Sequence, residues 1–106
     1  MAKYVAVGDS IDYTPSSEKN AGTVVVQSDL VGVTMAKIPA NTLGALSIRG
    51  VWQVAKAADT VAVGDSLYWD GGAGNATTTS TANTYMGKAA AAAASSDSVV
   101  KVALNV

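Results

Sequence analysis

The hexapeptide VAVGDS occurs twice in this chain, at residues 5–10 and 61–66, and each copy runs into a short segment with an aromatic residue. Glycine adopts a positive φ without steric cost, and aspartate can bond its own backbone two residues on, so a Gly-Asp pair favours a tight turn. Gly8 with Asp9, and Gly64 with Asp65, therefore predict two turns, each leading into a strand, SIDYT and SLYWD. Equivalent passages from turn to strand are typical of a small β-barrel or sandwich.

Length and composition predict one small domain whose surface carries few charges. At 106 residues the chain is near the commonest domain size, and we expect a single β-rich domain over residues 1–106. Its apolar residues are mainly valine and alanine, without phenylalanine, and such small side chains suit thin sheets better than a helical interior. Charged residues make up 14%, against roughly 25% in typical globular proteins, so we expect a partner to cover part of the surface.

The charges and the missing residue types exclude several function classes. The net charge is −1, and the seven lysines and arginines are scattered singly, whereas a nucleic-acid binder needs a basic stripe. No run of 18 apolar residues and no apolar leader segment occurs, so we expect a soluble protein made in the cytosol, with no membrane contact. The absence of cysteine excludes disulfides and thiolate chemistry.

Short antiparallel strands, with little or no helix, account for most of the chain. Residues 22–27 and 30–36 are β-branched runs separated by Ser28 and Asp29, which predicts a two-residue hairpin turn. Residues 65–81 indicate a strand, a glycine turn and a threonine-rich strand. The apolar positions of residues 45–57 alternate, but their register shifts at Gly50, which predicts a bulge or bend there.

The alanine run at residues 89–94 leaves two alternatives open. Alanine has the highest helix propensity, but the run is short, follows Gly87 and lacks an amphipathic face. Downstream, Val100, Val102 and Leu104 alternate as in a strand. We favour a strand, the turn SSDS at residues 95–98 and a second strand, and a short helix before the last strand is the alternative.

No group of residues in the sequence predicts catalysis, a cofactor or a metal site. The segment GGAGNATT at residues 71–78 lacks the lysine of a phosphate-binding loop, so it predicts a hairpin turn. The four aspartates at positions 9, 12, 65 and 70 are separated by apolar residues, which favours turn capping over a calcium site. Histidine and cysteine are missing, so the usual general base and nucleophile are absent and we expect no enzyme.

Three aromatic residues are expected in the core or at an interface between subunits. Trp52 and Trp69 stand in the apolar contexts GVWQV and LYWDG, where tryptophan is commonly the largest packing element of a small β-domain. Tyr68 precedes Trp69 and is assigned to the same group. A ligand-stacking role for the tryptophans is the alternative.

Several segments resemble the small capsid cement or decoration proteins of tailed bacteriophages. They are LVGV at residues 30–33, GVWQVAKA at 50–57, YWD at 68–70 followed by TTT at 77–79, and VKVALN at 100–105. The resemblance implies a β-tulip-like module on the outer surface of an icosahedral head, where it is a structural virion protein that bridges neighbouring major capsid subunits. It also implies a homotrimer at three-fold or quasi-three-fold positions. Some relatives carry a recombinase label, but this chain lacks the nucleotide loop and basic surface of such proteins.

The capsid contact is expected on an N-terminal arm, residues 1–7, with Lys3, Tyr4 and Val5 as candidate anchors. Tyrosine offers a rigid apolar ring with a hydroxyl group, and lysine reaches a carboxylate or carbonyl of a neighbour. The alternative is that residues 3–7 form the first strand of the domain's own sheet. We expect the trimer to use the apolar strand faces at residues 24–26 and 51–54.

One other function class stays open, a tail, spike or fibre module that binds a host receptor or carbohydrate. Carbohydrate binding would require an exposed aromatic platform, for which Trp52, Trp69 and Tyr85 are the candidates.

Overall fold

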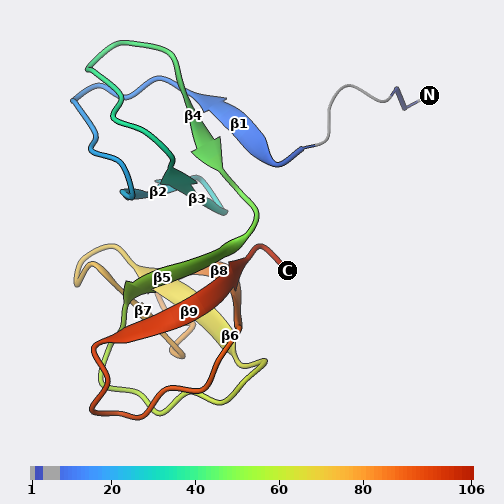
Figure 1. Ribbon diagram of the computed structural model, residues 1–106, viewed down its shortest axis with the longest axis vertical. Coiled ribbons are helices and arrows are strands. Elements are labelled where there is room, and N and C mark those ends of the chain that lie inside the picture. Colours follow the sequence, from blue (N-terminus) through green and yellow to red (C-terminus); the bar gives the residue numbers. More distant parts are fainter. Residues whose placement is uncertain (1, 4–7) are drawn as a thin grey trace.

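The computed structural model describes residues 2–3 and 8–106, and these form nine strands in two antiparallel sheets (Figure 1). The all-β prediction is confirmed, and the described part of the chain contains no helix. One sheet has four strands and the other five, and they follow each other along the long axis of a molecule that measures 39 × 36 × 23 Å.

The four-stranded sheet contains the first strands of the chain. Its strand order is β1 (Ser10–Tyr13), β4 (Gly44–Ser47), β3 (Leu30–Thr34) and β2 (Val24–Gln27). Gln27 pairs with Leu30, so β2 and β3 form the hairpin that Ser28 and Asp29 predict. Ser28 has a φ of 54°. The two edges of this sheet are therefore β1 and β2.

The five-stranded sheet curls toward a closed barrel. Its strand order is β5 (Val51–Ala55), β9 (Val99–Leu104), β8 (Thr84–Ala89), β6 (Ser66–Asp70) and β7 (Asn75–Thr77). β6 and β7 form the predicted hairpin, and the Asp70 carboxylate accepts the N–H of Gly72 at 3.0 Å within its turn. Beyond β5, Lys56 bridges to Ala76 of β7, and the Ala57 N–H donates to the Ala76 carbonyl at 2.9 Å. These contacts join the two edges of the sheet.

Gly50 marks the place where the chain passes from one sheet to the other. The predicted bend lies between β4 and β5, which belong to different sheets, and Gly50 has a φ of 98°. Its carbonyl accepts the N–H of Leu104 at 2.9 Å. The alternating run of residues 45–57 is therefore two strands, because the chain changes sheets in its middle.

The two sheets share one hydrophobic core. Val31 and Val33 of β3, which are 0% and 2% exposed, pack into a cluster whose other members come from the five-stranded sheet and its loops. These other members are Val54, Val61, Leu67, Ala76, Met86, Ala89, Ala93, Val100, Val102 and Leu104. Most residues of this shared core therefore belong to the curled sheet and its loops, and β3 covers them from above (Figure 1).

The alanine run forms neither a helix nor a full strand. β8 ends at Ala89, which pairs with Val102 of β9, so the chain forms a β8–β9 hairpin with a long connection. Within this connection Ala93 bridges to Val61 instead of continuing along β9. Alanine is small enough for this close approach, and pairing with the distant Val61 overrides its helix propensity.

Asn105 ties the end of β9 to the four-stranded sheet. Its side-chain amide donates to the carbonyls of Val31 at 3.0 Å and Ile48 at 2.9 Å, and its own N–H donates to the Met86 carbonyl at 2.8 Å. Asn105 has a φ of 53°, a conformation that asparagine tolerates better than most residues. One residue thus bonds to both sheets.

Candidate functional site

Of the three candidate anchors of the N-terminal arm, the structure places one. Lys3 is exposed and lies outside any strand, whereas Tyr4 and Val5 lie outside the described residues. The chain then passes Gly8 and reaches β1, an edge strand of the four-stranded sheet. Residues 1–7 therefore join the molecule at the edge of its smaller sheet.

The two VAVGDS segments have glycines in the same backbone conformation. Gly8 has a φ of 82° and Gly64 of 89°. In the second segment the Asp65 carboxylate accepts the N–H of Ala62 at 2.9 Å, which closes the turn before β6. The Asp9 carbonyl accepts the N–H of Ile48 at 3.0 Å, which holds the first segment beside β4.

Val61, the first residue of the second segment, is an anchor in the core. It is 2% exposed, and its N–H and carbonyl both pair with Ala93, at 2.8 and 2.9 Å. In the second copy, the first valine of VAVGDS therefore pairs through its backbone and buries its side chain.

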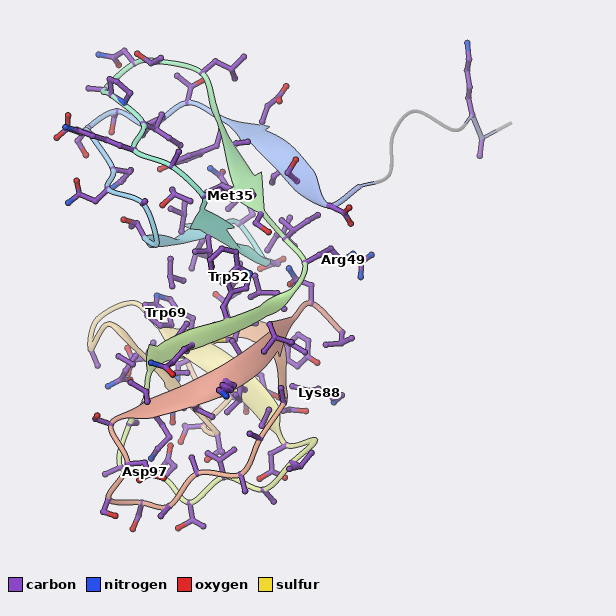
Figure 2. All side chains as sticks on the ribbon, in the orientation of Figure 1. Met35, Arg49, Trp52, Trp69, Lys88 and Asp97 are labelled. Atoms are coloured by element: carbon purple, nitrogen blue, oxygen red, sulfur yellow. The ribbon has the colours of Figure 1, made fainter. Side chains whose placement is uncertain are left out.

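Trp52 and Trp69 lie at the junction of the two sheets (Figure 2). Both are half-buried and pack against the shared core, and the Trp52 indole N–H donates to the Arg49 carbonyl at 3.0 Å. Their rings therefore contribute to packing between the sheets and still present part of their surface to solvent.

Tyr68 is half-buried on β6 and packs against Tyr85 of β8. Its ring meets that of Tyr85 edge to face, with centroids 5.7 Å apart. The Lys88 ammonium group lies 5.8 Å from the centre of the Tyr85 ring and donates to the Ser66 hydroxyl at 3.0 Å. The Tyr85 ring therefore already contacts an aromatic and a cationic neighbour, which does not favour it as a platform for a sugar.

Lys56 is a buried cation that sequence reasoning missed. It is 7% exposed, and its ammonium group donates to the carbonyls of Ala57 and Asp59, both at 2.7 Å. Lys56 follows β5 and continues the alternation of Trp52 and Val54, so it lies on the same side as these two residues. This spacing could have predicted from the sequence that Lys56 is buried.

Asp59 holds the segment that follows β7. Its carboxylate accepts the Thr77 hydroxyl at 2.6 Å and the Thr78 N–H at 3.2 Å. The Thr77 hydroxyl bond is the main cause that lowers the pKa of Asp59 below its ordinary value of 3.8, followed by the Thr78 N–H. The hydrogen bonds of Asp59 and Lys56 therefore hold the segment after β5 against β7.

We expect Asp59→Asn to weaken the acid sensitivity of folding. Because the pKa of Asp59 is lower in the folded protein, the unfolded chain binds more protons at acid pH, and the stabilisation is lost as the pH falls below 3.8. Urea unfolding at several pH values measures this: the wild type should lose more stability on acidification than the variant. Asp29→Asn, in the exposed β2–β3 turn, controls for the lost charge, and a wild-type pH slope in Asp59→Asn would contradict the assignment.

The described residues contain no group of three or more side chains suited to hold a metal ion. In the same part of the chain, no helix is long and apolar enough to cross a membrane.

Several large apolar side chains are exposed on both sheets and their loops. The most exposed are Met35, Leu43, Val51, Val63 and Val106, at 61–68%. A contiguous apolar patch marks a surface that meets other proteins, whereas single exposed apolar side chains are common on any protein.

Comparison with known proteins assigns a family. The family model of the phage cement protein matches residues 5–104, nearly the whole chain. No curated protein and no solved structure matches. Phage cement proteins are structural, not enzymatic, and lie on the surface of the virion capsid, so the sequence-based predictions of family, location and non-enzymatic function are confirmed. The chain belongs to the phage cement protein family and is a structural protein of the phage capsid.

Proposed function

We propose that this capsid protein strengthens the phage head by bridging neighbouring major capsid subunits. The supporting observation is the match to the phage cement protein family over residues 5–104. Large apolar side chains are also exposed on both halves of the molecule, such as Met35 next to β3 and Val51 on β5. Only 14% of the residues are charged, so little desolvation of charge opposes the burial of this surface. The protein would bind the capsid subunits by burying apolar surface and forming hydrogen bonds, and it would catalyse no reaction.

We propose that Lys3, Tyr4 and Val5 of the N-terminal arm make one of these capsid contacts. The second VAVGDS segment supports this, because its first valine, Val61, pairs through both backbone groups and buries its side chain. Val5 holds the same position in the first segment, so the proposed partner is an extended segment of a capsid subunit. Tyr4 adds apolar area and a hydroxyl group, and Lys3 a cation.

A homotrimer on the capsid is a further part of the proposal. Val26 on β2 and Val51 on β5 are 39% and 61% exposed, so both strands present apolar side chains to solvent, and Val54 of β5 is buried in the core. Light scattering of the free protein and density averaged about a three-fold axis test this state. Single copies away from any such axis would contradict it.

The experiment uses heads of the phage that encodes this chain, assembled without it. Adding the protein should raise the temperature at which the heads release DNA, followed by dye fluorescence, because a ligand that binds only the intact shell stabilises it. Protein lacking residues 1–4 should fail to bind while keeping the circular dichroism of the wild type. Equal release temperatures with and without the wild-type protein would refute bridging, and a truncated protein that unfolds would assign the arm to the domain's own sheet.

A further inference from the structure

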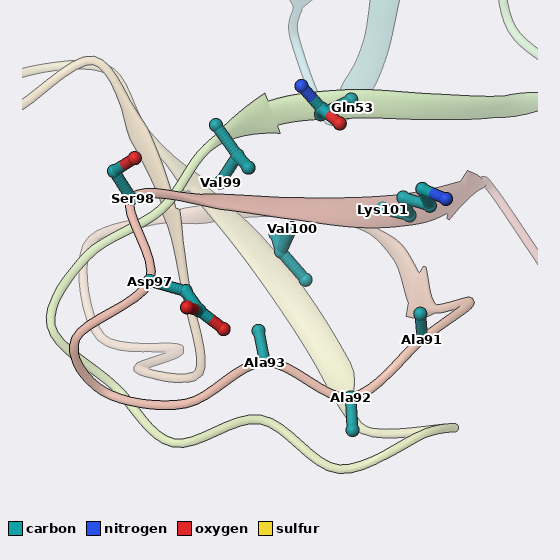
Figure 3. A pocket seen from close by; sticks show the side chains of 9 residues that line it. All are labelled: Gln53, Ala91, Ala92, Ala93, Asp97, Ser98, Val99, Val100 and Lys101. Atoms are coloured by element: carbon teal, nitrogen blue, oxygen red, sulfur yellow. The ribbon is translucent and has the colours of Figure 1, made fainter.

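A groove of about 360 Å³ lies between β9 and the connection that leads into it from β8 (Figure 3). Its lining includes Gln53 of β5, Val99 and Lys101 of β9, and Ala91, Ala92 and Asp97 of the connection. Among the residues that the structure describes, those lining the groove include neither a part of the proposed arm nor an aromatic residue, and three residues of the alanine run, Ala91, Ala92 and Ala93, line it.

The wall of the groove is held in place on both sides. Ala93 pairs with Val61 through two backbone bonds, and the Asp97 carboxylate accepts the N–H of Ala94 at 2.8 Å. The Ser98 carbonyl accepts the N–H of Lys56 at 2.9 Å, which fastens the end of the connection to β5. The alanines add only methyl groups, so another chain can approach this backbone closely.

The other side of the groove is formed by side chains on β5 and β9. Val99 is 42% exposed, and Gln53 lies directly opposite Lys101 in the strand register. Lys101 is exposed, and no salt bridge links it to any residue that the structure describes. In this described part of the chain, the only charge on the strand side of the groove is therefore Lys101, which a carboxylate complements. The carboxylate of the opposite wall, Asp97, is bonded to the Ala94 N–H.

The groove is far from the place where the arm joins the molecule. Residues 1–7 lead into β1 of the four-stranded sheet, whereas all residues that line the groove belong to the five-stranded sheet and its β8–β9 connection. A molecule that bridges two subunits needs two contacts, and widely separated ones let it reach two different subunits.

We propose that this groove is a second capsid contact, which takes an extended segment of a neighbouring major capsid subunit with small apolar side chains and a carboxylate for Lys101. The inference rests on the proposed bridging function. A small molecule fits less well, because Ala92, Asp97 and Val99 are exposed and ligand pockets bury about 70–90% of their ligand. A short extended chain matches a shallow groove with strand side chains on one side and the backbone of the alanine-rich connection on the other.

Two variants of the full chain test the groove. Ala92→Trp fills it from an exposed position, and Lys101→Glu reverses its cation. Ala73→Trp, in the exposed β6–β7 turn, and Lys88→Glu, on β8, are the matched controls. Co-sedimentation with heads lacking the protein measures affinity, and we expect both groove variants to bind about a hundredfold more weakly than their controls, because one of two linked contacts is lost.

Chemical cross-linking identifies the occupant independently of head stability. A carbodiimide that joins amines directly to carboxylates should link Lys101 of bound wild-type protein to an aspartate or glutamate of the major capsid protein. A link from Lys101 to another copy of this chain, or affinities of Ala92→Trp and Lys101→Glu equal to those of the controls, would overturn the proposal while bridging stands. Wild-type binding and cross-linking without any rise in the DNA release temperature would instead refute bridging and support the groove as a contact.

Discussion

Gly87→Ala is expected to lower the free energy of unfolding by about 3–5 kcal/mol, a large part of what a domain of this size has. A Cβ atom at Gly87 would lie 2.1 Å from the carbonyl oxygen of Ala103, and this oxygen belongs to the backbone of β9 and has no flexible side chain to move aside. Gly87 also has a φ of 150°, which other residues rarely adopt. Alanine would therefore push β9 away from β8 and open the core around Leu104 and Met86.

Two other glycines separate the causes of this loss. Gly64 has a φ of 89° but open space around it, so Gly64→Ala should cost only the backbone term, about 1–2 kcal/mol. Gly71 has neither a neighbour within 4 Å nor a positive φ, so Gly71→Ala should change stability by less than about 0.5 kcal/mol. Urea unfolding followed by the fluorescence of Trp52 and Trp69 gives the three values. A loss for Gly87→Ala no larger than for Gly64→Ala would show that β9 moves aside at little cost.

Asn105→Ala is expected to lower the free energy of unfolding by about 2–4 kcal/mol. The change removes both bonds of the side-chain amide to the Val31 and Ile48 carbonyls, which then lack a donor at the junction of the sheets. It also forces alanine into a φ of 53°. Thermal unfolding followed by circular dichroism measures the loss.

Substitutions of Asn105 by glycine and by aspartate distinguish the loss of the amide hydrogen bonds from the strain of the positive φ. Asn105→Gly keeps the backbone conformation available and removes only the amide, so it should be less damaging than Asn105→Ala. Asn105→Asp keeps the size of the side chain but points carboxylate oxygens at two carbonyl oxygens, so at neutral pH it should be at least as damaging. An Asn105→Asp variant as stable as the wild type would contradict the role of the amide as a clamp between the sheets.

Local sequence signals predicted the strands and turns well, because their causes are local. Ser28 with Asp29, and the glycine-rich segment after Asp70, sit between β-forming runs and form hairpins in the structure. The shift of register at Gly50 predicted a bend. It could not predict that the chain changes sheets there, because this depends on which strands pair further along the chain. The pairing of Lys56 with Ala76, which closes the larger sheet, also joins residues 20 positions apart and has no signature of its own.

For the alanine run, local sequence signals also failed to predict a pairing between residues that are distant in the sequence. Its local propensity favoured a helix, the strand pattern after it favoured a hairpin, and neither predicted that Ala93 would pair with Val61. The groove beside it results from that distant pairing, so no motif could predict it. The candidate arm was predicted from its position before the first turn, and its contact with the capsid remains a proposal.

The strand order of the larger sheet delays the pairing of β5 while the chain is being synthesised. β5 pairs along its length only with β9, so residues 51–55 must wait until residues 99–104 have been made. At about 5–20 residues per second the ribosome needs a few seconds for this interval. During that time a valine-containing strand has both backbone edges open, apart from the single bridge near Lys56, and open strands invite association between chains. Slower or cooler expression therefore lengthens the vulnerable interval, whereas a low concentration of nascent chains makes it harmless.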